Sequence, residues 1–422
     1  MTEREDIYQA AITMFSTRDW SFYATCMSKF FIQIQRWPDT ITHLVRMVLD
    51  ELPQGGTFFD AALSFLPMEQ WPEVVQMTVT ALWQKADHKA AQQIISYASL
   101  QCPQAVHPYL EQLFPLMGDD LLEAFREVNL EQVRFLFGAS PYRKSPYSEK
   151  LVLSQAFRAL LETRLPEALA FVRSHDDEHL SYYLSSIGFE ETPEGFRQLY
   201  SPQVLHLAFS PDYLSQLLSH STKDEDKCHP TWGQADTHAS RYRFGGQSNT
   251  RCGTCGERAH HLITLDPVPP SLGVTELPRI ELVVCLSCLG WEQSILSYQH
   301  DENGKPKNIR QSEIALSPQF PAEPLKETEV NLLERETRWR WQDWGRSNGR
   351  ENLHRVGGHP TWIQHAEYPR CPLCGKTSTF LMQLDSYLPT SDEGEWLWGS
   401  GGIGYVFWCD GCKVTSFLFQ CT

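Results

Sequence analysis

The C-terminal half of the chain contains one cysteine block twice, and this repeat constrains the fold more than any other feature. Each block consists of a Cys-x-x-Cys pair, a long insertion and a second Cys-x-x-Cys pair. The eight cysteines are Cys252, Cys255, Cys285 and Cys288 in the first block and Cys371, Cys374, Cys409 and Cys412 in the second. Zn²⁺ takes four tetrahedral ligands and binds thiolates well. The pattern therefore predicts two structural Zn²⁺ ions per chain.

Other segments around the cysteines recur in the same order. The matched segments are 229–234 with 359–364 (both containing His-Pro-Thr-Trp), 262–266 with 381–385, and 298–299 with 419–420. An ordered match of this kind predicts two homologous subdomains of one design, which pack as pseudo-symmetric halves.

The insertions within the blocks are 29 and 34 residues long, more than the roughly 15–20 of compact four-cysteine fingers. Each site should therefore enclose an inserted hairpin, in a zinc-ribbon arrangement of knuckle, strand, excursion, strand and knuckle. Gly256, Gly375 and Gly411 are expected to supply the positive φ that such knuckles require. The alternative interpretation of each Cys-x-x-Cys is a redox pair or two buried small side chains. A closed set of four sulfurs indicates a structural rather than a catalytic metal.

Four further cysteines have no partner by spacing. Cys26 and Cys102 lie in helical patterns and are expected in the core. Cys421 follows the last block, and Cys228 precedes His229, where an additional ligand set is an alternative.

The first ~185 residues show apolar residues at the three-to-four spacing of helices. The expected helices are 7–15, 22–34, 41–52, 74–83, 90–100, 110–116, 151–161 and 168–172. Short helices with short connections favour a solenoid-like array of helical pairs, with an irregular bundle as the alternative.

From about residue 190, Gly, Pro, Trp and Cys become frequent and short β-rich runs appear. The expected strands are 280–284, 380–384, 404–408 and 414–419, with a linker over 301–326. The predicted fold class is α+β, with an all-α helical-repeat domain followed by a duplicated β-rich zinc-ribbon-like module. The predicted domains are 1–189, 190–310 and 311–422.

Charge restricts the partners that the chain can bind. There are 36 Lys and Arg against 52 Asp and Glu, a net charge of −16. Such a surface repels nucleic acid and anionic membranes and attracts basic proteins. The N-terminus has no secretory signal pattern and no apolar run reaches 18 residues. Because the cysteines pair as metal ligands, a reducing compartment is expected, and we predict a cytoplasmic protein.

One stretch, 335–355, combines basic and aromatic residues. Its candidate partner-binding residues are Arg338, Trp339, Arg340, Trp341 and Trp344. Arg and Trp together suit a protein interface or nucleic-acid stacking. The alternative is a connector whose tryptophans fill a core and whose arginines pair with nearby acids.

The second block resembles the programmed cell death protein 2 family and its bacterial YwqG-like relatives. The segments that carry the resemblance are 356–364, 368–375, 380–385 and 404–412, within a similar region of roughly 228–422. The resemblance implies duplicated β-rich modules that bind proteins. Eukaryotic members act as chaperones for a basic ribosomal protein, and bacterial relatives often resemble immunity proteins encoded beside toxins. The first block departs from the pattern, because Gly233 replaces Ile363.

No P-loop or His-Glu-x-x-His motif occurs, and we expect a non-enzymatic protein. The first hypothesis is an immunity protein that binds and neutralises a basic toxin. The alternatives are a chaperone or adaptor for a basic client such as a ribosomal protein, and an enzyme or a nucleic-acid-binding zinc-ribbon protein.

Overall fold

The structure is a computed structural model of the 422-residue chain. It describes residues 8, 11–13, 16, 40–52, 62–144, 151–175, 180–217, 229–232, 241–309, 317–347 and 351–422. The chain forms two compact units. The helical unit comprises 1–187, 193–196 and 222–230, and the sheet unit comprises 188–192, 197–221 and 231–422. Within the described residues, no helix is long and apolar enough to cross a membrane.

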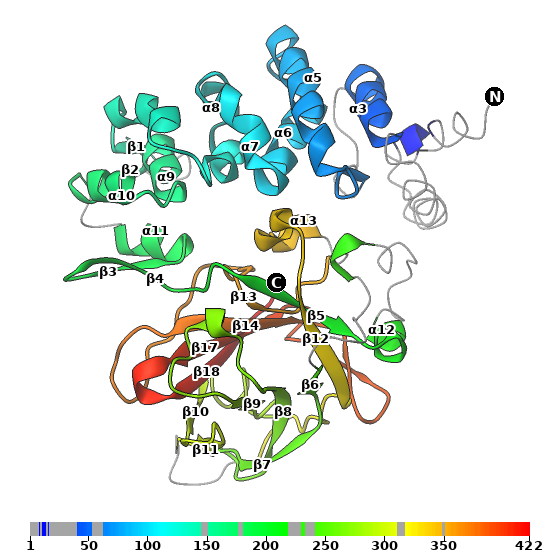
Figure 1. The fold of residues 1–422 in the computed structure, drawn as a ribbon, viewed down its shortest axis with the longest axis vertical. Helices are drawn as coiled ribbons and strands as arrows, with labels where there is room; N and C mark the ends of the chain where they lie inside the picture. Colours follow the sequence, from blue (N-terminus) through cyan, green and yellow to red (C-terminus); the bar gives the residue numbers. More distant parts are fainter. Residues whose placement is uncertain are drawn as a thin grey trace. The chain divides into compact units, whose positions relative to one another are not determined.

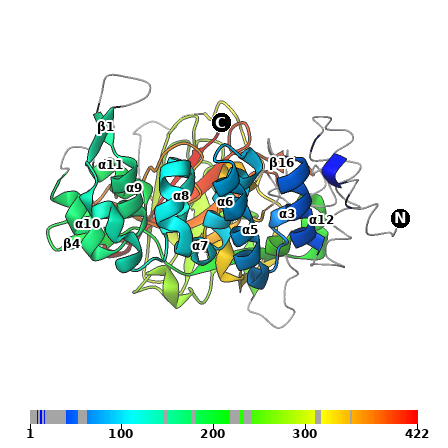
Figure 2. The same ribbon diagram turned by 90° about the horizontal axis from the view of Figure 1, so that it is seen from above.

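The helical unit consists of short helices that follow one another in chain order (Figures 1 and 2). Its α-helices are α3 (Thr40–Glu51), α5 (Trp71–Gln84), α6 (Lys89–Gln101), α7 (Pro103–Val106), α8 (Leu110–Met117), α9 (Gln155–Glu162), α10 (Pro166–Arg173) and α11 (Leu180–Ser186). The 3₁₀ segments η3 (Gly118–Phe125) and η4 (Glu131–Gly138) lie between α8 and α9. The helices expected from periodicity at 41–52, 74–83, 90–100, 110–116 and 168–172 are confirmed. A solenoid order stays a prediction, and most of 7–15 and all of 22–34 lie outside the described residues.

The helix expected over 151–161 begins later than predicted. Residues Leu151–Leu153 form strand β2, which pairs with β1 (Tyr142–Lys144), and α9 starts at Gln155. Ser154 explains the boundary, because its side chain accepts a hydrogen bond from the backbone N–H of Phe157 (3.3 Å) and caps the helix. This N-cap satisfies one of the unpaired N–H groups of the first turn.

The sheet unit is built round a nearly closed antiparallel sheet of 12 strands (Figure 1). Its strands are β5 (Val204–Phe209), β6 (Arg241–Phe244), β7 (Gln247–Arg251), β8 (Arg258–Leu265), β9 (Ile280–Val284), β10 (Leu296–His300), β11 (Pro306–Asn308), β12 (Thr328–Glu334), β13 (Arg355–Gly357), β14 (Thr379–Asp385), β17 (Ile403–Cys409) and β18 (Val414–Gln420). The order is β11-β10-β18-β17-β14-β13-β5-β12-β6-β8-β7, and β9 pairs with β8. The strands expected at 280–284, 380–384, 404–408 and 414–419 are confirmed.

Two small hairpins and two short helices accompany the sheet. They are β3 (Phe189–Thr192) with β4 (Gly195–Gln198), β15 (Leu388–Pro389) with β16 (Glu395–Trp396), α12 (Pro211–Leu217) and α13 (Trp344–Ser347).

The two cysteine blocks share this one sheet. Strand β10 of the first block pairs with β18 of the second, and β12 lies between β5 and β6. Residues 190–310 and 311–422 therefore exchange strands instead of forming separate sheets. The expected linker over 301–326 includes β11, and Leu325 at its end is fully buried in the core.

Strands β5 and β13 carry equivalent segments of the two halves and pair with each other. A Leu-His pair at 205–206 recurs at 353–354. His206 lies opposite Arg355, and the Leu207 backbone N–H donates to the His354 carbonyl (2.9 Å). The two equivalent segments thus face one another across an antiparallel pair, as expected where a pseudo-twofold axis relates two halves.

The sheet stays open on the first block's side. In the second block β17 pairs with β18 from Ile403 to Cys409. Across residues 241–309 the counterparts β9 and β10 form no ladder. Contacts from Glu281 bridge them instead, because its carbonyl contacts His300 Nε2 (3.0 Å) and its N–H donates to the Gly304 carbonyl (3.0 Å).

Candidate metal centre

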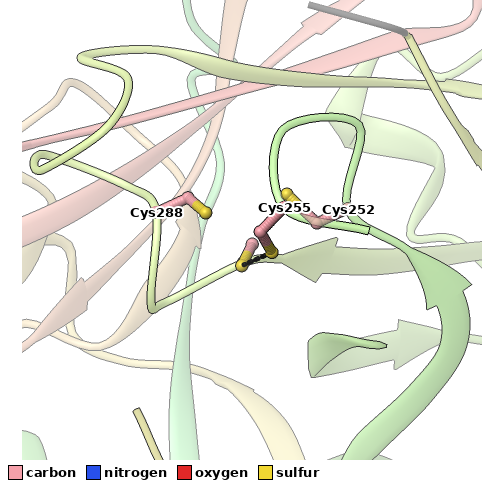
Figure 3. A group of neighbouring side chains, drawn as sticks. Cys252, Cys255 and Cys288 are labelled. Carbon is pink, nitrogen blue, oxygen red and sulfur yellow. Dashed lines mark hydrogen bonds between the residues drawn. The ribbon is translucent and has the colours of Figure 1, made fainter. Parts of the chain in front are cut away.

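The first cysteine cluster is assembled from the ends of three strands. Cys252 and Cys255 occupy the turn between β7 and β8, and Cys285 and Cys288 follow β9. Figure 3 shows the sulfurs of Cys252, Cys255 and Cys288 directed toward one common space. Because β8 and β9 pair antiparallel from His260 to Leu265, the turns at their neighbouring ends are brought together.

The second cluster is built in the same way. Cys371 and Cys374 precede β14, Cys409 is the last residue of β17, and Cys412 lies in the turn between β17 and β18. The structure brings together all eight cysteines predicted from the spacing, in the predicted two sets of four.

The first knuckles of both blocks have the same backbone pattern. In one, the Gly256 N–H donates to the Cys252 carbonyl (3.0 Å); in the other, the Gly375 N–H donates to the Cys371 carbonyl (2.9 Å). Both glycines have positive φ, 79° and 71°, as expected. Gly411 does not, since Lys413 is the residue at positive φ (52°) in the last turn.

An arginine braces each of these knuckles, which the sequence reasoning missed. Arg251 donates to the Gly256 carbonyl (2.9 Å) and Arg370 donates to the Gly375 carbonyl (3.1 Å). Each arginine directly precedes the first cysteine of its block, so the repeated Arg-Cys pair was the available signal.

The sulfur positions fit a tetrahedral metal. Within each set, the sulfurs all lie within 4.8 Å of one another. The Sγ atoms of Cys255 and Cys285 are 3.8 Å apart, and those of Cys374 and Cys409 are 3.7 Å apart. Four sulfurs at about 2.3 Å from a tetrahedral Zn²⁺ would be separated by about 3.8 Å, whereas a disulfide requires about 2.05 Å. Each set of four sulfurs therefore fits one divalent ion, and the measured sulfur–sulfur distances are too long for disulfides.

Hydrogen bonds among the thiols of the first set shift their pKa values in opposite directions. Hydrogen bonds from Cys285 and Cys288 hold the pKa of Cys252 far below its usual range, and the same bonds raise the pKa of both donors. A divalent ion would take the place of these shared protons, because metal ligation requires thiolates.

The second set is more open. A backbone hydrogen bond from Lys376 lowers the pKa of Cys374 to about 7, while burial raises that of Cys409 to about 12 and a hydrogen bond with Cys374 raises that of Cys412 to about 11. Cys374 is exposed and Cys412 half-buried, whereas all four cysteines of the first set are buried. The two sets therefore differ in solvent access.

Of the remaining cysteines, the structure describes Cys102 and Cys421, and neither belongs to a four-cysteine set. Cys102 is buried at the end of α6, as predicted for a helical core residue. Cys421 is partly exposed near the C-terminus, and Cys26 and Cys228 lie outside the described residues.

The repeated His-Pro-Thr-Trp segment is held in place by a buried polar network, which the sequence did not reveal. The Thr361 hydroxyl accepts from Arg355 (2.8 Å), its N–H donates to Gln383 (2.9 Å) and its carbonyl accepts from the Tyr405 hydroxyl (2.7 Å). In the first block, the Thr231 hydroxyl accepts from the Asn352 N–H (2.8 Å). The threonine of each motif is thus anchored by hydrogen bonds within the sheet unit.

Arg355 is the centre of this network and is fully buried. Its guanidinium donates to the Gln342 side-chain oxygen (3.1 Å), which also accepts from His206 (3.0 Å), and the Gln342 amide donates to Glu351 (2.9 Å). Burial lowers the pKa of Arg355 to about 10 and that of His206 to about 3. The network therefore stabilises the positive charge of Arg355, and His206 is neutral.

The candidate partner-binding residues divide by burial. Arg338 and Trp339 are buried in the 3₁₀ segment Thr337–Arg340, with the guanidinium 4.5 Å from the indole centroid. Arg340, Trp341 and Trp344 are half-buried, and the last two pack against the smaller aromatic core of the sheet unit. This burial agrees with the connector alternative, and contact with a partner stays a prediction.

Comparison with known proteins places the sheet unit in a family. A curated relative, an uncharacterized protein named YpfL from Salmonella typhimurium (strain LT2), is 42% identical over 67 residues. The match covers 16% of this chain and 15% of that relative. The comparison with solved structures found no match. The family described as "Domain of unknown function (DUF1963)" matches residues 177–411, which is more than half of the chain. The matched region contains every cysteine of the two sets except Cys412. The chain therefore belongs to the DUF1963 family.

Proposed function

We propose that this protein is a non-enzymatic, zinc-dependent interaction module that binds a basic protein partner. The observation that carries the proposal is the pair of four-sulfur sets on one sheet of a chain with net charge −16. A metal held by four protein sulfurs has no open position for a substrate, so it would support the fold of a binding surface. An acidic surface raises the association rate of basic proteins.

Zinc is the metal that the donor chemistry favours. Four thiolates in a set with tetrahedral spacing suit Zn²⁺, which has no geometric preference of its own and no redox chemistry to damage the ligands. Such a site would be kept reduced in a compartment like the cytoplasm, which is where we place the protein.

The partner class follows from the resemblance to the programmed cell death protein 2 and YwqG-like proteins. We favour an immunity protein that neutralises a basic toxin, because the acidic charge suits a stoichiometric inhibitor. A chaperone or adaptor for a basic client such as a ribosomal protein uses the same charge complementarity and is the alternative. A nucleic-acid-binding role would depend on the stretch 335–355, where Arg340 is half-buried and Arg338 is buried.

The test is affinity purification of the tagged full chain from its native host, followed by mass spectrometry and binding kinetics with the purified partner. The proposal expects a basic protein whose association slows as salt rises, since salt screens the long-range attraction. Co-purification of a toxin domain would favour immunity, and a ribosomal protein would favour the chaperone alternative. Residues 1–185 should be required for full affinity, because helical arrays offer extended binding surfaces.

An acidic partner would contradict the proposal. Submicromolar RNA or DNA affinity at physiological salt would replace it with the nucleic-acid alternative, if that affinity is lost on changing Arg340→Glu and retained on changing Arg241→Glu, a half-exposed arginine outside the stretch 335–355.

A further inference from the structure

Two large aromatic side chains beside the first cysteine set are exposed. Trp291 is 54% exposed and Phe320 is 46% exposed, yet their ring centroids lie only 4.5 Å apart. The two residues are far apart in the sequence, so the fold, and not their position along the chain, brings the two rings together. Exposed apolar side chains that gather in this way mark surfaces that another molecule covers.

The second knuckle of the metal set holds Trp291. The Cys288 carbonyl accepts hydrogen bonds from the backbone N–H groups of Trp291 (3.3 Å), Glu292 (2.9 Å) and Gln293 (3.1 Å). The turn that places Cys288 in the sulfur set thus also sets the position of the indole.

Two hydrogen bonds attach the segment carrying Phe320 to this knuckle, and a third attaches it to β8. The Gln319 N–H donates to the Glu292 carboxylate (3.1 Å), and the Ala322 N–H donates to the Ser287 hydroxyl (3.0 Å). The third is the bond between His260 Nε2 and the Ala322 carbonyl (3.0 Å).

The tautomer of His260 is defined by its other nitrogen. Nδ1 accepts the Leu286 N–H (3.0 Å), so Nε2 carries the proton that it donates to Ala322. The side chain is buried. Both aromatic side chains therefore project from backbone that is ordered before any partner arrives, which lowers the entropic cost of binding.

The charge of the two segments is one-sided. Residues 286–293 and 317–325 contain Glu292 and Glu323 and neither Lys nor Arg. Glu323 is exposed and Glu292 is half-exposed. An aromatic face attracts a guanidinium or ammonium group, and a neighbouring carboxylate adds a charge-assisted hydrogen bond. The same carboxylates repel phosphates.

We propose that the surface formed by Trp291, Phe320, Glu292 and Glu323, the aromatic–acidic patch, docks arginine or lysine side chains of an extended basic segment in the partner protein. This inference rests on the proposed function, which makes the partner basic, and it identifies the surface that binds the partner's basic side chains. A guanidinium lies over the indole while the carboxylates neutralise it.

The test measures binding of a fluorescein-labelled nona-arginine peptide to the metal-loaded full chain by fluorescence anisotropy. Trp291→Ala and Phe320→Ala leave the net charge unchanged, and each should weaken binding about tenfold, as expected for loss of one cation–π contact with its apolar area. Trp291→Phe retains an aromatic face and should stay within about threefold of wild type. The matched control is Trp83→Ala in α5, whose side chain is 57% exposed and which should change affinity less than twofold.

A charge variant adds a second readout. Glu292→Gln with Glu323→Gln retains an oxygen to accept the Gln319 N–H, so it should weaken binding and flatten its salt dependence without loss of the bound metal. Metal content, measured for every variant, separates lost binding from lost folding.

The outcomes distinguish this inference from the function it rests on. If nona-arginine binds wild type and both alanine variants equally, the patch is not the docking surface, while the basic-partner proposal stands. If wild type binds nona-glutamate in preference to nona-arginine, the proposed function itself fails. If the alanine variants weaken binding and Trp83→Ala does not, the patch is confirmed.

Discussion

Leu296 of β10 lies directly opposite Phe417 of β18, and the two are equivalent residues of the repeated blocks. Tyr298-Gln299 matches Phe419-Gln420, so Leu296 and Phe417 each lie two residues before the matched pair. Equivalent residues meet in an antiparallel pair only at a twofold relationship. The blocks are therefore joined as two halves of one sheet, and neither half has a complete set of strand partners without the other.

This pairing predicts that the blocks cannot be separated. A fragment of residues 311–422 would expose the edge of β18 that β10 covers and should aggregate, since an uncovered strand edge recruits other chains. Residues 188–422 retain the whole sheet and should be soluble and metal-binding. Size-exclusion chromatography and circular dichroism of the two fragments test this, and a monomeric, folded 311–422 would disprove the joint fold.

The two cysteine sets should release metal at different rates. Cys374 is exposed and Cys412 half-buried, whereas the first set is buried throughout. A chelator should remove one ion quickly and the second slowly, monitored with a chromogenic metal indicator. Cys374→Ser should abolish the fast phase alone, and the matched Cys255→Ser the slow phase alone. A single phase that both variants alter equally would contradict the assignment.

The buried arginine should be needed for stability. Arg355→Met removes the donor shared by Gln342 and Thr361 and the buried charge that interacts with Glu351, so the free energy of unfolding should fall by about 3–5 kcal/mol. The control is Arg241→Met, whose ion pair with Glu329 (3.0 Å) is more than half exposed on both sides and should contribute less than about 1 kcal/mol. Equal destabilisation in urea titrations would argue against a central role for Arg355.

The buried histidines should make the sheet unit sensitive to acid. Burial lowers the pKa of both His206 and His354 to about 3, from 6.5. The unfolded chain protonates these histidines more readily than the folded chain does. The free energy of unfolding is therefore unaffected by them above pH 6.5 and declines as pH falls toward 3. At pH 5 each histidine should lower the free energy of unfolding by about 2 kcal/mol relative to neutral pH.

His206→Gln isolates this effect, since the amide can still donate to Gln342. The difference in unfolding free energy between pH 7 and pH 5 should shrink by about 2 kcal/mol in the variant. Acid release of metal affects wild type and variant alike, so it does not enter the comparison. An unchanged difference would show that His206 is not the group that titrates.

The cysteine sets could be predicted from sequence because their signal is local. Each Cys-x-x-Cys turn determines two ligand positions by itself, and the repeat supplies the second pair. The strands β9 and β17 were likewise visible as short apolar runs. In contrast, the start of α9 was missed because a side-chain cap at Ser154 overrides the apolar periodicity that precedes it.

The polar network and the shared sheet could not be predicted in the same way. Burial of Arg355 depends on β13 lying between β5 and β14, which is a long-range pairing with no local signature. The placement of β12 between β5 and β6 is similarly set by the closure of the whole sheet. The aromatic–acidic patch depends on contacts between residues about thirty positions apart, of which Glu292 with Gln319 is one.

The most direct test of the account is zinc-edge X-ray absorption spectroscopy on the full chain, combined with native mass spectrometry. The account predicts two Zn²⁺ ions per chain, each surrounded by four sulfurs at about 2.3 Å. Fewer than two tightly bound ions, nitrogen or oxygen atoms in the coordination shell, or masses showing disulfides among the eight cysteines would contradict it.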